Sequence, residues 1–120
     1  MNIAKFNKLF AKTCDETYAL VGERKHYSKE DALVMMDGAT PIIIRNFKIH
    51  EQRIVSCENK INRIGKEYLK CMQKTMGFEG VILSMTFGIL EGASEIKEGA
   101  GEKLLADSLA VGGIKMSRTS

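Results

Sequence analysis

The chain has few of the residues that break helices or build catalytic centres. Among its 120 residues it has no tryptophan, two histidines and a single proline, Pro41. Because proline is the strongest helix breaker, its scarcity favours long helices. The sequence also lacks a glycine-rich phosphate loop, a His-Glu-x-x-His helix and a Cys-x-x-Cys pair. These motifs carry the common nucleotide, metal and redox chemistries. The sequence therefore predicts a protein that is not an enzyme and that needs no metal or cofactor.

Cysteine and long apolar runs are also scarce. The three cysteines (Cys14, Cys57 and Cys71) are odd in number and share no short spacing. That pattern argues against a disulfide framework and for reduced thiols. The first residues lack the apolar core of a signal peptide. The longest strongly apolar stretch, 81–90, is too short to cross a bilayer. We therefore expect a cytoplasmic protein without a membrane partner.

What remains is a composition typical of one globular domain. Hydrophobic residues make up 44% of the chain and charged residues 28%, which are ordinary values. Apolar side chains recur at helical spacing, and glycines separate the periodic segments. The sequence predicts an all-α helical bundle of four to five helices, forming a single domain over 1–111 with a flexible tail at 112–120. The predicted helices span 2–21, 28–38, about 41–76, 81–98 and 103–111.

A seven-residue repeat runs through the long central helix predicted at about 41–76. Its apolar rows occupy the a and d positions of a heptad, which is typical of a helix that lies along another helix. We predict a coiled-coil-like seam that joins two or more copies of the chain. The alternative is the central helix of a single-chain bundle, because the apolar stripe is wider than a two-stranded seam requires. The predicted interface residues are Phe47, Ile54, Cys57, Ile61, Ile64, Tyr68 and Cys71.

The segment 27–48 has the pattern of a helix-turn-helix. Ser28 is placed to cap a first helix, Gly38 to end it, and Thr40-Pro41 to begin a second helix. In such units the start of the second helix meets the base edges of DNA. The outward residues there would be Thr40, Arg45, Asn46 and Lys48, with Lys29 near the phosphates. The alternative is a plain helical hairpin.

A basic stripe lies further along the predicted central helix. Its basic residues recur at steps of three and four residues, which places them on one face; they are Lys60, Arg63, Lys66, Lys70 and Lys74. The stripe is either a phosphate-binding surface or a solvated helix flank. Its lysines taken as nucleic-acid contacts are Lys66, Lys70 and Lys74.

Two functions follow from these features. The first is a small regulatory protein that forms a homodimer or a higher homo-oligomer and reads DNA through 40–48. The second is a helical assembly or adaptor protein that binds another protein and no nucleic acid. Such a protein would use the seam or the helix that carries Gly88 and Gly92, where small residues let another helix come close.

Overall fold

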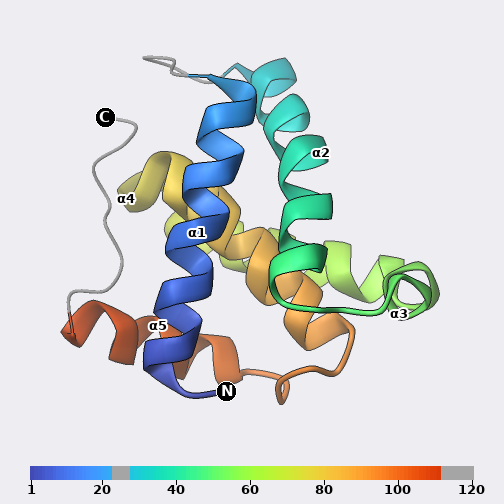
Figure 1. The fold of residues 1–120 in the computed structure, drawn as a ribbon, viewed down its shortest axis with the longest axis vertical. Helices are drawn as coiled ribbons and strands as arrows, with labels where there is room; N and C mark the ends of the chain where they lie inside the picture. The colour runs from blue at the N-terminus through green and yellow to red at the C-terminus, as the bar shows by residue number, and fades with distance from the viewer. Residues whose placement is uncertain (23–27, 112–120) are drawn as a thin grey trace.

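In a computed structural model the chain folds into α-helices, as its sequence predicts (Figure 1). The structure describes residues 1–22 and 28–111, apart from the side chains of Lys29 and of residues 71–76. No strand occurs within these ranges. The predicted tail, 112–120, lies outside the described residues. The helices are α1 (Ile3–Val21), α2 (Lys29–Asn46), α3 (Glu51–Ser56), α4 (Glu58–Gly92) and α5 (Ala100–Ala110).

Helices α1 and α2 lie side by side and run in opposite directions (Figure 1). The Asn2 side chain caps the start of α1 by accepting a hydrogen bond of 2.8 Å from the Lys5 backbone N–H. Gly22 ends the helix with a positive φ of 80°, and its N–H donates to the Tyr18 carbonyl. These caps confirm the helix predicted over 2–21.

The predicted helix-turn-helix does not form, because α2 continues through Gly38 and Pro41 as one helix. Its predicted start is confirmed, since Ser28 and Asp31 form a reciprocal capping box. Proline inside a helix removes one hydrogen bond and costs about 3 kcal/mol. Tertiary packing offsets that cost, because the flanking Ala39, Ile42 and Ile43 are buried. A turn that local residues favour is thus overridden by burial on both sides of it.

The predicted long helix over 41–76 is also not continuous. Helix α2 ends at Asn46, and Lys48 adopts the left-handed conformation with a φ of 55°. The Ile49 N–H then donates to the Ile44 carbonyl and the Lys48 N–H to the Arg45 carbonyl, which is the pattern of a Schellman cap. A second, smaller break at Cys57 separates α3 from α4.

Helix α4 is bent at Gly77, whose φ of 54° and ψ of −127° lie outside the helical region. The bend divides it into a first half (58–76) and a second half (78–92). A Cβ on Gly88 would lie 2.8 Å from the Ile61 carbonyl oxygen and 2.9 Å from the Gly65 nitrogen. Gly92 is similarly close to Ile61. The two halves therefore fold back on each other, and the close approach predicted at Gly88 and Gly92 is confirmed.

The second half of α4, rather than 41–76, lies at the centre of the core. Its Phe87 ring stacks on Phe6 of α1 with centroids 5.4 Å apart and contacts Tyr68 at 5.0 Å. Helix α5 crosses the N-terminal end of α1 in the lower part of the bundle (Figure 1). It is fixed there by Glu91 Oε1, which accepts hydrogen bonds from the Tyr68 hydroxyl (2.7 Å) and from the Gly101 N–H (3.0 Å).

Candidate functional site

An apolar groove opens between α2, α3 and both halves of α4. It encloses about 460 Å³, which falls within the range of ligand-binding clefts. Apolar side chains dominate its lining, and the charged ones sit at its edges. The apolar lining residues are Met36, Ile54, Val55, Ile61, Leu69, Val81, Met85 and Ile89, and the others are Asp37, Thr40, Glu58, Asn62, Gly65, Lys66 and Ser84.

Two hydroxyl groups in this groove are engaged within their own helices. The Ser84 hydroxyl donates to the Gly80 carbonyl at 2.7 Å, and the Thr40 hydroxyl donates to the Met36 carbonyl at 2.9 Å. Their protons are therefore not offered to a molecule in the groove. The lining suits an occupant that presents apolar side chains and satisfies its own polar groups.

The edge of the groove carries large apolar side chains that the chain itself leaves uncovered. Val55 of α3 is 76% exposed. Leu33 is 55% exposed, and on a helix it shares a face with Met36 and Thr40, three and seven residues later. The apolar surface therefore extends one turn of α2 beyond the groove. Contiguous exposed apolar surface of this kind marks interaction sites.

The first half of α4 brings positive charge to one side of the groove. Lys66 lines the groove and is exposed. Arg63 and Lys70 lie three residues before and four residues after it, so they occupy the same face. Arg63 lies 3.6 Å from Glu67, and both side chains are more than half exposed. On the α2 side, the exposed residue lining the groove is Asp37.

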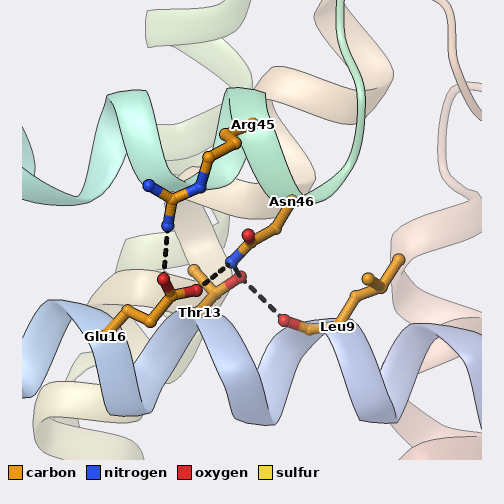
Figure 2. Close-up of polar contacts among 5 residues, drawn as sticks. All are labelled: Leu9, Thr13, Glu16, Arg45 and Asn46. Atoms are coloured by element: carbon orange, nitrogen blue, oxygen red, sulfur yellow. Dashed lines mark hydrogen bonds and ion pairs between the residues drawn. The ribbon is translucent and has the colours of Figure 1, made fainter.

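Two residues predicted to read DNA are instead engaged in contacts between α1 and α2 (Figure 2). The Asn46 amide is buried and donates to Thr13 Oγ1 (3.1 Å) and Glu16 Oε1 (2.9 Å). Thr13 donates in turn to the Leu9 carbonyl. The Arg45 guanidinium forms an ion pair with Glu16. The hydrogen bond from Asn46, and then the charge of Arg45, lower the pKa of Glu16.

Apart from the buried Asn46, the described residues predicted to contact nucleic acid lie in two places. Thr40, Arg45 and Lys48 line a shallow hollow of about 480 Å³ beside the end of α2. Lys66 and Lys70 lie on the first half of α4. The structure therefore brings together three of the four predicted base-reading positions, and it places the described lysines of the basic stripe on a different helix. The side chains of Lys29 and Lys74 are not among those described.

Five of the seven residues of the predicted seam belong to the core of a single chain or pack against it. Phe47, Ile64 and Tyr68 are buried in the core, and Ile54 and Ile61 pack against it. Cys57 is partly buried, and the side chain of Cys71 is not described. The chain's own helices thus cover much of the seam, as the single-chain alternative expects. The edge that stays open, at Ile54 and Ile61, belongs to the groove.

Sequence patterns did not identify the groove, because its lining comes from segments that are distant in the sequence. The sequence pattern places Leu33, Met36 and Val55 on helices, but it does not place all three on one surface. The contact of Glu91 with Tyr68 and Gly101 was also missed. The one sequence signal for this contact is the glycine at position 101, because a Cβ there would lie 2.5 Å from the Tyr68 hydroxyl.

Neither a metal-binding cluster nor a membrane-spanning helix occurs in the described part of the chain. No group of three or more histidine, cysteine, aspartate or glutamate side chains is placed there to hold a metal ion. None of the helices described combines the length and apolar character needed to cross a membrane. Comparisons with models of protein families, with curated proteins and with solved structures found no match.

Proposed function

We propose that the protein is a helical adaptor that binds an amphipathic helix of another protein in the groove between α2, α3 and α4. The observation that carries this proposal is the apolar lining, which includes the exposed Val55. The exposed Leu33 lies outside the lining, one helical turn before Met36 on α2. Burying such side chains against a partner is favourable by about 25 cal/mol for each Å² removed from water. The role proposed for the groove is binding without catalysis.

The walls of the groove favour a helical occupant. All of them are helices, whose backbone groups are already paired, so an extended peptide finds no strand edge to join. A helix satisfies its own backbone and presents only side chains. Along α4 the lining runs from Glu58 to Leu69, which corresponds to about 16 Å at 1.5 Å per residue. That length matches about three turns of a partner helix.

The proposal is tested by selecting helical peptides against the full chain. A display library would present helices of about four turns with a randomised apolar face and glutamine elsewhere. We expect the strongest binder, here named the groove peptide, to lose at least tenfold in affinity for Val55→Lys, because the lysine places a charge against its apolar face. The matched control is Val111→Lys. Val111 is exposed like Val55 (65% against 76%) but lies at the end of α5.

Two results would contradict the proposal. One is a library from which no peptide is enriched above a scrambled-face library. The other is a groove peptide that binds Val55→Lys and Val111→Lys equally well. Circular dichroism of both variants would show that each keeps the helical fold.

Nucleic-acid binding is the second candidate function, and the strip of Arg63, Lys66 and Lys70 is the observation in its favour. Such a strip suits phosphate contacts, which make affinity fall steeply with salt. Base reading by Arg45 and Asn46 has less support, because both contact Glu16. Gel shifts with random duplex at about 50 and 200 mM salt would test this function. Absence of a shift at the lower salt would remove it.

A second copy of this chain is the competing occupant of the groove. A homodimer formed through the edge at Ile54, Val55 and Ile61 would keep part of the predicted seam. Light scattering over a range of concentrations would measure the mass. A dimer that Val55→Lys converts to a monomer would assign the groove to self-association. For either occupant we propose a cytoplasmic setting, because the three cysteines share no short spacing and argue for reduced thiols.

A further inference from the structure

The two long walls of the groove carry opposite charges. The wall formed by the first half of α4 presents Lys66, and Lys70 lies one helical turn further along the same face. The wall formed by α2 presents Asp37. All three side chains are exposed at the edge. A helix lying in the groove would therefore have a basic surface along one of its flanks and an acidic residue along the other.

Neighbouring acidic residues leave the basic wall in place. Glu67 pairs with Arg63 at 3.6 Å, and neither residue lines the groove. Glu58 also lines the groove, but it precedes Lys66 by eight residues, or about 12 Å along α4. The positive charge is thus concentrated toward the end of the groove that Leu69 lines.

We infer that the partner helix carries acidic residues along the flank that meets α4 and none along the flank that meets α2. This inference rests on the proposed function, since it specifies the chemistry of the helix that the groove binds. The apolar lining supplies contact area without distinguishing one amphipathic helix from another. The charged walls supply the distinction, because like charges at the edge penalise the wrong partner and complementary charges speed the encounter.

The expected size of this effect is modest, because the charges are exposed. Exposed ion pairs gain little energy individually and are screened by salt. Two lysines acting on the same flank should nonetheless change affinity about fivefold to tenfold. The change should shrink as salt is raised, whereas the contribution of the apolar face should not.

The experiment places charge on each flank of the groove peptide in turn. One version carries glutamate in place of glutamine along the first flank, and the other carries it along the second flank. We expect one version to bind about tenfold more tightly than the other at low salt, because only one flank meets α4. In the Lys66→Glu/Lys70→Glu variant the preference should disappear or reverse.

The control is Lys97→Glu/Lys103→Glu, which changes the net charge by the same amount at exposed positions outside the groove lining. It should keep the preference between the two peptides. If the glutamine peptide binds in the groove but both glutamate versions bind alike, the charge inference is wrong and the proposed function stands. If no peptide loses affinity for Val55→Lys, both the charge inference and the proposed function are wrong. A preference that survives in Lys66→Glu/Lys70→Glu would also overturn the inference.

Discussion

The two halves of α4 have adjoining sequences but different environments, because the first half buries only one face, at Ile64 and Tyr68. The first half (58–76) presents Arg63, Lys66 and Lys70 to solvent. In the second half (78–92) most side chains are buried, and Phe87 stacks at the centre of the core. A heptad repeat marks the first half, whereas the second is apolar on nearly every side. The comparison teaches that a regular seam identifies a helix that packs along a neighbour, while all-round apolarity identifies the helix at the centre.

The largest expected difference in stability between the two halves follows from replacing one leucine in each with alanine. Leu83 in the second half is fully buried, whereas Leu69 in the first half is partly exposed in the groove. We expect Leu83→Ala to lower the free energy of unfolding by about 3 kcal/mol, because it leaves a cavity. Leu69→Ala should cost about 1 kcal/mol or less, and urea denaturation would measure both. Equal losses would contradict the assignment of the second half to the core centre.

Replacing a glycine in each half with alanine should change the free energy of unfolding in opposite directions. A Cβ on Gly88 meets the backbone of Ile61 and Gly65 at 3.0 Å or less, so Gly88→Ala should cost about 1–3 kcal/mol. At Gly65 the nearest atom, the Ser84 carbonyl oxygen, is 3.7 Å away. Gly65→Ala should therefore be neutral or stabilising by up to about 1 kcal/mol, because alanine favours helix. Melting temperatures would show the signs, and a Gly88→Ala protein as stable as the parent would refute the close crossing.

The smallest expected effect concerns the hydrogen bond that joins the two halves. Burial, and then the hydrogen bond to Glu91, raise the pKa of Tyr68. The folded state therefore holds this proton more tightly than the unfolded state, whose tyrosine pKa is about 10. The contribution to stability is complete below that pH and is lost as pH rises from there through the folded-state pKa.

Tyr68→Phe should consequently cost about 1 kcal/mol near neutral pH. The difference in unfolding free energy between the parent and the variant should narrow above about pH 10. Urea denaturation at a series of pH values would measure it. A difference that stays constant from neutral to strongly alkaline pH would mean that the hydroxyl does not form this buried bond.

Local sequence patterns predicted the helices where a cap or a glycine determines the boundary. Ser28 caps α2 and Gly22 ends α1 as expected. The ends that were missed lack a glycine in the left-handed position. Lys48 and Ser94 both have a positive φ, although glycine is the residue type that usually indicates this conformation. The helix predicted over 81–98 ends earlier, at Gly92, where Ser94 adopts the left-handed conformation after the end of α4.

Long-range packing accounts for the remaining differences. Gly38 and Pro41 predicted a turn, but burial of Ala39 and Ile43 keeps α2 helical through them. The groove depends on how α2 and α3 lie against α4, which no local pattern contains. The candidate site could therefore be predicted only as separate fragments, the seam residue Ile61 and the basic residue Lys66 among them.

The most direct test of the proposed adaptor role is an NMR titration of the full chain with the groove peptide. Methyl groups of Ile54, Val55, Ile61 and Met85 report on the groove, and those of Leu109 and Val111 report on the far end of α5. The proposal predicts saturable shifts in the first set and none in the second. Shifts confined to α5, or to the hollow beside Lys48, would contradict it.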